Sequence, residues 1–117
     1  MSGVPIDYDG RVFRSSAAET ASAGEVPVGR YHQAGDTVWA DFDGGRVVRG
    51  YLVGRRAPDD SLELAYCQVL ADATVVSGRV RSTPELLPDG RVRLREEWER
   101  YGPHASRGVS VIEEIPA

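Results

Sequence analysis

The sequence predicts an all-β fold, a small antiparallel up-and-down β-barrel of about eight strands. From Val38 to Ile115, apolar and polar residues alternate in one short stretch after another, the pattern of strands with one buried face. Turns rich in Asp and Gly separate these stretches, and none of them shows the 3.6-residue period of a helix. Short connections between sequential strands favour up-and-down order, and eight strands close into a barrel just wide enough for one small ligand.

The expected elements follow one another along the chain, which we interpret as a single domain covering residues 1–117. A turn at Asp9-Gly10 leads into a short strand, and the small, polar residues 15–25 are expected to form a loop or a flap beside the barrel mouth. Two prolines in residues 84–90 remove ladder donors and indicate a longer connection. The other expected strands span residues 28–33, 37–42, 46–54, 62–70, 75–82, 91–100 and 108–115.

The strand expected at 91–100 indicates most clearly which side chains face the barrel interior. Every second residue in it is charged, and this face must be solvated: Arg93, Arg95, Glu97 and Glu99. Neighbouring residues of a strand point to opposite faces, so Glu96 and Trp98 are expected inside.

The same alternation assigns the inward side chains of three further strands. Glu63 should lie in water, which puts Tyr66 and Gln68 inside strand 62–70. Two arginines of strand 75–82 face out, so Ser82 faces in. The expected inward row of strand 46–54 is Val48, Gly50 and Leu52.

Three strands leave the facing less certain. Strand 28–33 could aim either Tyr31 and Gln33 or Arg30 and His32 inward, and we prefer the uncharged pair. Strand 37–42 most simply buries Val38, Ala40 and Phe42, which would leave Trp39 exposed. The last strand allows two phases, in which either Glu113 or Glu114 is interior.

Glu96 is the candidate catalytic residue. An apolar cavity disfavours the charged form of a carboxyl group, so its pKa rises toward neutrality and it can act as an acid or a base. An equally weighted alternative is a structural ion pair with an inward arginine, for example Arg14 or Arg30.

The expected ligand-binding residues are the polar and aromatic side chains of the predicted interior. Tyr66 and Gln68 would orient a ligand, although they could instead bond to each other or to buried water. Ser82 has no nucleophile context and serves at most as a wall of the pocket. The full set is Tyr31, Gln33, Tyr66, Gln68, Ser82 and Trp98.

Composition narrows the classes of function. The net charge is -4 at pH 7 and no basic stripe is present, so binding to nucleic acid is not expected. All 14 basic residues are Arg, which excludes Schiff-base and P-loop chemistry that requires a lysine. His32 and His104 lack metal-ligand spacing, and no metal or other cofactor is expected.

Other features favour a cytoplasmic protein. No apolar run approaches the roughly 20 residues of a membrane-spanning helix, and no secretory signal is visible at the N-terminus. Cys67 is alone and cannot form an intramolecular disulfide. The expected partner is a small, partly apolar molecule, bound by a monomer or a homodimer.

Four segments resemble a family of small bacterial proteins that is often labelled N-acetylglutamate synthase. They are Phe13-Arg14-Ser15, GGRVVRGYLVG (44–54), STPELLPDGRVRLREEW (82–98) and GVSVIEEI (108–115). The resemblance covers nearly the whole chain, its PELLPDGR and REEW strings are the most specific part, and it implies no catalytic residues for this sequence. By architecture the predicted barrel is also similar to the calycin-like barrels of lipocalins and avidins, an analogy of shape alone.

The sequence therefore leaves three hypotheses. The first is a barrel that binds a small molecule in a partly polar internal cavity. The second is a cofactor-independent isomerase or cyclase of a secondary metabolite, in which Glu96 moves the proton. The third is a non-catalytic interaction protein with a filled barrel, dimeric through an exposed face bearing Trp39 and Tyr51.

Overall fold

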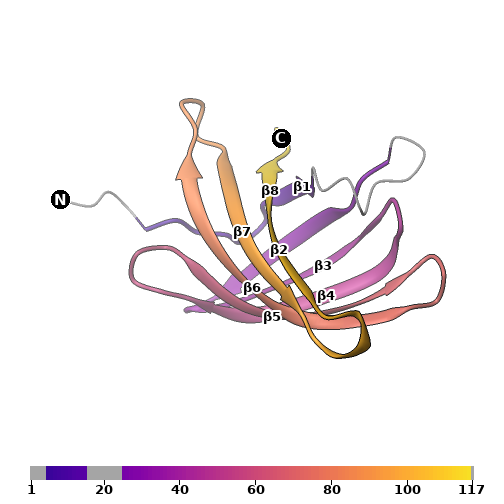
Figure 1. Cartoon of the computed structure of the whole chain (residues 1–117). Coiled ribbons are helices and arrows are strands. Elements are labelled where there is room, and N and C mark those ends of the chain that lie inside the picture. Colours follow the sequence, from indigo (N-terminus) through magenta and orange to yellow (C-terminus); the bar gives the residue numbers. More distant parts are fainter. Residues whose placement is uncertain (1–4, 16–24, 117) are drawn as a thin grey trace.

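The computed structural model describes residues 5–15 and 25–116, which form a closed barrel of eight antiparallel strands (Figure 1). Each strand pairs with the next one in sequence, and β8 pairs with β1 to close the barrel. The predicted all-β, up-and-down architecture is thus confirmed. The strands are β1 (Val12–Ser15), β2 (Val28–Ala34), β3 (Thr37–Gly44), β4 (Val47–Arg56), β5 (Leu62–Leu70), β6 (Val75–Leu86), β7 (Val92–Arg100) and β8 (Ser106–Glu114).

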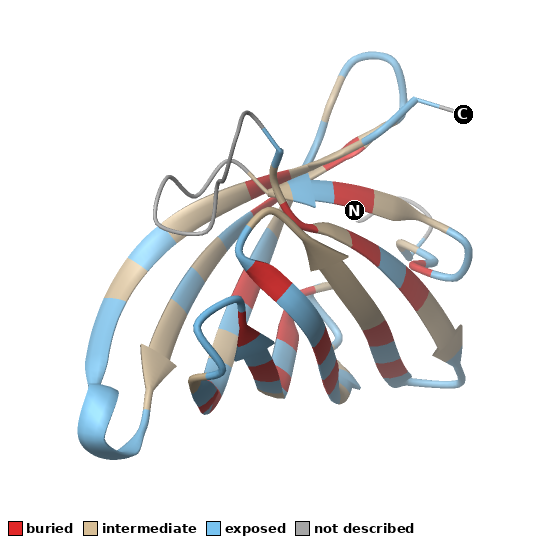
Figure 2. Cartoon of the chain, turned by 90° about the vertical axis from the view of Figure 1, so that its right-hand side faces the viewer, coloured by how far each residue is buried: buried red, intermediate tan, exposed pale blue. Residues whose placement is uncertain are grey.

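Alternating burial along the strands defines the inside of the barrel, as Figure 2 shows in its red and pale blue bands. Tyr31 is 2% exposed, so β2 aims its uncharged row inward as preferred. Trp39 is 40% exposed, as expected for the outer face of β3. On β8, the Glu114 side chain is 16% exposed and that of Glu113 is 41% exposed, so Glu114 belongs to the inward phase.

A β-bulge reverses the facing expected at the start of β4. The register of β4 against β5 shifts between Val47 and Arg49, so one extra residue interrupts the alternation. As a result Val47 is buried and Val48 is 59% exposed. The prediction that Val48 faces inward is therefore wrong, whereas Gly50 and Leu52 do face inward as expected.

Strand β6 extends past Ser82, where the sequence predicted its end, and includes the first of the two prolines in residues 84–90. The strand continues to Leu86, and Pro84 lies opposite Leu94 of β7. Pairing with β5 stops at Ser82, so β6 has a neighbour on one side only beyond that point, and proline is tolerated in such an edge. The connection is accordingly shorter than predicted for residues 84–90.

The N-terminal segment closes the end of the barrel at which β3, β5 and β7 begin. Tyr8 is fully buried and packs in the same core cluster as Val38 and Leu62, two residues at these strand starts. Its hydroxyl donates a hydrogen bond to the Asp60 carbonyl oxygen at 2.6 Å. Its backbone N–H donates to the Gln33 side-chain oxygen at 2.9 Å. Tyr8 therefore acts as a plug for this end.

We expect Tyr8→Ala to lower the free energy of unfolding by about 3 to 5 kcal/mol, because it removes a large buried ring and leaves a cavity. Tyr8→Phe keeps the ring but loses the hydrogen bond to Asp60, which corresponds to about 1 kcal/mol. Urea denaturation of both variants measures these differences. Tyr101→Ala, a change at an exposed tyrosine, serves as the control. A cost below about 1 kcal/mol for Tyr8→Ala would mean that the plug does not stabilise the barrel.

Candidate functional site: a cavity inside the barrel

The half of the barrel opposite Tyr8 is not filled. A cavity of about 130 Å³ lies at the end where β1, β3, β5 and β7 finish, which we call the mouth. An apolar cavity of about 150 Å³ holds benzene in another protein, so the space here corresponds to one small ring. The lining residues are Phe13, Ser15, Pro27, Gly29, Tyr31, Phe42, Val47, Leu52, Tyr66, Gln68, Val80, Glu96, Trp98, Arg100, Ser110 and Ile112. The flap expected at residues 15–25 falls mostly on residues 16–24, outside the described residues.

Aromatic rings opposite glycines create the space of the cavity. Phe42 pairs with Gly50 across β3 and β4, and Trp98 pairs with Gly108 across β7 and β8. A Cβ at Gly50 would overlap the Phe42 ring, and one at Gly108 would lie 2.6 Å from Trp98 Cζ2. Each ring therefore lies flat over the backbone of its partner strand, and the centre stays open. Tyr66 pairs with Gly78, where a Cβ would collide with the Glu99 carbonyl oxygen and would also lie 2.9 Å from Tyr66 Cε1.

Glu96 lies in the cavity, in the middle of a cross-strand row of small hydroxyl residues. Its direct neighbours on β6 and β8 are Ser82 and Ser110. The Ser82 hydroxyl donates a hydrogen bond to Glu96 Oε2 at 3.2 Å. Burial raises the pKa of Glu96 to about 7, and the hydrogen bond from Ser82 partly opposes this rise. A carboxyl group with this pKa exists in both protonation states near neutral pH.

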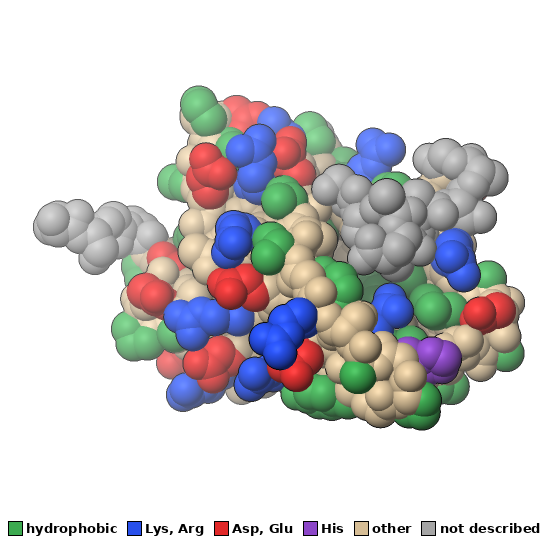
Figure 3. Space-filling view, in the orientation of Figure 1, with side chains coloured by type: hydrophobic (Ala, Val, Ile, Leu, Met, Phe, Trp, Pro, Cys, Tyr) green, Lys and Arg blue, Asp and Glu red, His purple; other side chains and the backbone are tan. Residues whose placement is uncertain are grey.

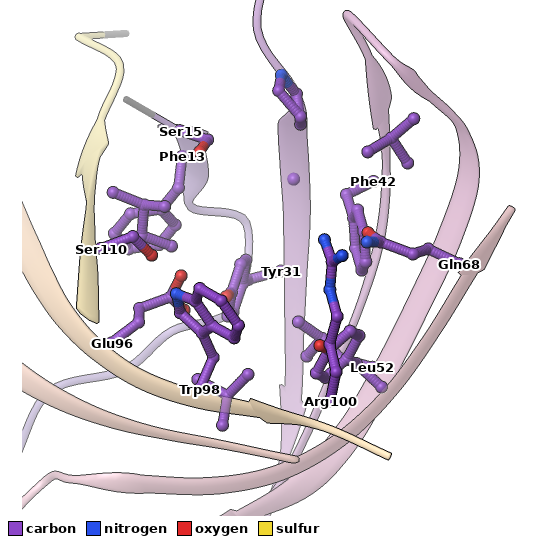
Figure 4. A pocket seen from close by; sticks show the side chains of 16 residues that line it. Phe13, Ser15, Tyr31, Phe42, Leu52, Gln68, Glu96, Trp98, Arg100 and Ser110 are labelled. Atoms are coloured by element: carbon purple, nitrogen blue, oxygen red, sulfur yellow. The ribbon is translucent and has the colours of Figure 1, made fainter. Parts of the chain in front are cut away.

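No ion pair neutralises Glu96 among the described residues. The alternative hypothesis, a structural ion pair with an inward arginine such as Arg14 or Arg30, is therefore not supported. Arg30 instead pairs with Asp41 at 3.0 Å and with Asp43 at 3.4 Å on the outer face, and Arg14 is exposed. Glu96 also acts electrostatically on Tyr31. Burial is the main cause that raises the pKa of this tyrosine, and the negative charge of Glu96 is the second. Figure 4 shows the Glu96 carboxylate pointing toward Tyr31 beside the Trp98 ring.

Most of the polar side chains that the sequence predicted do line this cavity. Tyr31, Tyr66, Gln68 and Trp98 come together with Glu96, whereas fully buried Ser82 reaches the site only through its hydrogen bond to Glu96. Within the described residues, no hydrogen bond joins Tyr66 to Gln68 or uses the Gln68 carboxamide. Gln68 is only 8% exposed and lines the cavity, so its amide can form hydrogen bonds with a molecule bound there.

Gln33 lies outside the cavity, so it is not part of the site that we propose. Its side-chain oxygen accepts from Tyr8 and its side-chain nitrogen donates to the Gly35 carbonyl at 2.8 Å, both at the closed end. Glu114 is likewise committed there, because it pairs with Arg11 at 2.7 Å and accepts from the Val92 N–H. The inward phase of a strand thus does not by itself place a residue at the mouth.

The sequence did not lead us to several lining residues. The most important of them is Arg100, because it brings a positive charge to the cavity. It follows Trp98 at a spacing of two residues on β7, so the alternation itself was the available signal. Its guanidinium carbon lies 5.7 Å from the centre of the Trp98 ring, within the range of a cation–π contact. Burial raises the pKa of Tyr66, and the guanidinium of Arg100 opposes that rise. Phe13 was also missed, whereas Phe42 was expected inside, and Ser110 and Ile112 belonged to one of the two phases left open for the last strand.

The outer surface carries a second hollow across β4 to β8, and half of the residues that line it are charged. Opposite charges face each other across its strands, as in Arg79 with Glu99 at 3.1 Å and Arg93 with Glu113 at 3.1 Å. Figure 3 shows arginine and acidic side chains interspersed on one face. Among residues 5–15 and 25–116, no cluster of His, Cys, Asp or Glu could hold a metal ion, and no helix is long and apolar enough to cross a membrane. The expected cytoplasmic location stays a prediction.

A closed up-and-down barrel with a cavity at one end is the architecture of calycin-type barrels. A family model described as Avidin-like protein matches residues 6–115. The chain therefore belongs to the Avidin-like family, and the predicted avidin-type architecture is confirmed. Comparison with curated proteins and with solved structures gives no significant match. The resemblance to proteins labelled N-acetylglutamate synthase stays a prediction.

Proposed function

We propose that this protein binds one small, partly apolar molecule inside its barrel. The observation that carries the proposal is a cavity walled by aromatic rings and also lined by the polar side chains of Gln68, Glu96 and Arg100. Small-molecule sites have this composition: mostly apolar walls with a few polar groups that fix the orientation of the ligand. Membership of the Avidin-like family supports a binding barrel.

The proposed roles follow from the height of each side chain in the barrel. Trp98 and Phe42 would contact the faces of a ring. Glu96, held by Ser82 and beside Tyr31, would exchange hydrogen bonds with a polar group at the inner end of the ligand. Gln68 would add a donor or acceptor nearer the mouth. Because Glu96 accepts when ionised and donates when protonated, this end can accept more than one kind of polar group.

Titration with benzamide, a neutral ring of about the cavity's size, tests the proposal. We expect saturable NMR chemical-shift changes at the Trp98 indole N–H and at the Ile112 methyl groups, which both belong to cavity residues. The indole N–H of Trp39, on the outer face, is the internal control. Changes that fail to saturate, or that are as large at Trp39 as at Trp98, would contradict binding in the barrel.

Proton transfer by Glu96 is the second candidate function, favoured by its pKa of about 7 within a cavity. A cofactor-independent isomerase or cyclase would need such a group. The elimination of 1,2-benzisoxazole is a suitable probe, because the base takes the C3 proton, the N–O bond breaks and 2-cyanophenolate leaves. We expect its rate to rise with an apparent pKa near 7 and to vanish in Glu96→Gln. A rate that is unchanged in this variant would exclude Glu96 as the base.

A further inference from the structure

We propose that the molecule bound in this cavity carries an anionic group of the carboxylate type, which Arg100 recognises at the mouth of the barrel. This inference rests on the proposed function, because it names the chemical class of the ligand for the same cavity. The evidence for it is that Arg100 is partly buried without an ion pair among the described residues, and that other hydrogen-bond donors lie near its guanidinium.

Arg100 has no counter-ion among the described residues, and its guanidinium contacts only the Trp98 ring and the Tyr66 hydroxyl there. Six arginines form no ion pair within the part of the chain that the structure describes: Arg14, Arg46, Arg49, Arg81, Arg100 and Arg107. Five of them are exposed, so water solvates their charge. Arg100 alone among the six is half-buried and lines the cavity. A half-buried charge without an ion-pair partner is less well solvated than an exposed one, so an anion at this position would gain more than one at the surface.

The local structure aims the Arg100 guanidinium into the cavity. Gly78 of β6 lies between Tyr66 of β5 and Arg100 of β7 in one cross-strand row. Because Gly78 has no side chain, Tyr66 and Arg100 can meet above it, as the effect of Arg100 on the pKa of Tyr66 indicates. Figure 4 shows Arg100 extending into the space between Tyr31 and Gln68.

Other hydrogen-bond donors point into the same space. Gln68 is a largely buried residue whose amide makes no hydrogen bond among the described residues, and the Tyr66 hydroxyl lies on the same inward row of β5. A guanidinium with a neighbouring amide and a phenol suits a planar group with two anionic oxygens, because the guanidinium donates two parallel N–H bonds. This donor set distinguishes a carboxylate from a neutral amide of the same shape.

Glu96 does not compete for Arg100. The two residues are four positions apart on β7, which corresponds to roughly 13 Å along a strand. No ion pair joins them, and Trp98 lies between them on the same inward row. The cavity therefore has a cationic pole at the mouth and an acidic pole deeper inside. A ligand with its ring on Trp98 would place its anionic group at the mouth.

Benzoate and benzamide form the matched pair of probes, titrated at pH 6 by NMR or calorimetry. We expect wild-type protein to bind benzoate at least tenfold more tightly than benzamide. Arg100→Gln should weaken benzoate by about 10- to 100-fold and benzamide by less than about threefold. Arg100→Lys keeps the charge without the planar fork and should give an intermediate loss. Arg107→Gln changes an exposed arginine that forms no ion pair with any described residue; it is the control and should change neither affinity.

Each outcome decides one of the two proposals. Equal affinity for the two probes in wild type, or an equal loss of both in Arg100→Gln, would overturn anion recognition and leave the binding barrel standing. Loss of benzoate binding in Arg107→Gln would assign the effect to overall charge and also overturn it. If neither probe saturates in wild type, both proposals fail. Retention of the native NMR spectrum by Arg100→Gln confirms that the comparison concerns folded protein.

Discussion

Glu96→Gln is expected to stabilise the protein at alkaline pH and to remove one component of the pH dependence of its stability. The folded-state pKa of Glu96 is about 7, raised from an ordinary value of 4.5 by burial. Between these two pH values the unfolded chain releases the proton while the folded protein keeps it. The folded state then binds more protons, so the free energy of unfolding falls as the pH rises through this window.

The expected size of the effect follows from the same shift. Each pKa unit corresponds to about 1.4 kcal/mol, so the loss should reach about 3 kcal/mol and level off once Glu96 ionises in the folded protein above about pH 7. Glutamine does not titrate and avoids this loss. The stability difference between Glu96→Gln and wild type should therefore grow by about 3 kcal/mol between pH 4 and pH 8, measured by urea denaturation at each pH.

Two further variants make this prediction specific. Glu97→Gln changes an exposed carboxylate of the outer face, 3.3 Å from Arg95, and should leave the pH dependence nearly unchanged. Ser82→Ala removes the hydrogen bond that lowers the pKa of Glu96, so the window should extend to higher pH. A Glu96→Gln variant whose stability runs parallel to wild type at every pH would show that the carboxyl group is in contact with water.

Gly108→Ala is expected to abolish binding of benzamide. The new Cβ would lie 2.6 Å from Trp98 Cζ2, so the indole ring must move off the β8 backbone and into the cavity. Crowding of this kind costs about 1 to 3 kcal/mol of stability, and a cavity of about 130 Å³ has no room to spare for both a displaced ring and a ligand. Titration with benzamide measures the loss, and Trp98 fluorescence reports the ring movement.

Val109→Ala is the matched control for this change. Val109 is the next residue of β8, points outward and is exposed, so its truncation should leave benzamide affinity within about twofold of wild type. Full benzamide affinity in Gly108→Ala would show that the ligand does not occupy the space beside Trp98. A loss of affinity in Val109→Ala would instead place the binding site on the outer face.

The strand order and most of the inward rows could be predicted because charge marks the outside of a barrel. On β7 the outward face is entirely charged, which leaves only one face for Glu96 and Trp98. The same logic failed at Val48, because a bulge is a backbone irregularity that residue alternation does not reveal. It also failed to end β6, where Pro84 is acceptable only because β5 no longer pairs with it.

The candidate site was harder to predict than the fold, because an inward phase does not say at which height a residue lies. Gln33 and Gln68 are both inward amides, yet Gln33 serves the Tyr8 plug and Gln68 faces the cavity. The plug itself depends on contacts between Tyr8 and residues more than 50 positions away, which no local pattern encodes. Arg100 was overlooked because a charged strand end suggests solvent, although alternation places it inside.

The pKa of Glu96 is the most direct test of the central claim that this carboxyl group lies in a cavity with no counter-ion among residues 5–15 and 25–116. An NMR titration of its side-chain carboxyl carbon would measure it in the unmodified protein. We expect a midpoint near pH 7, and a displacement of that midpoint when benzamide occupies the cavity. A midpoint near 4.5 that benzamide leaves unchanged would contradict both the buried acid and the binding site built around it.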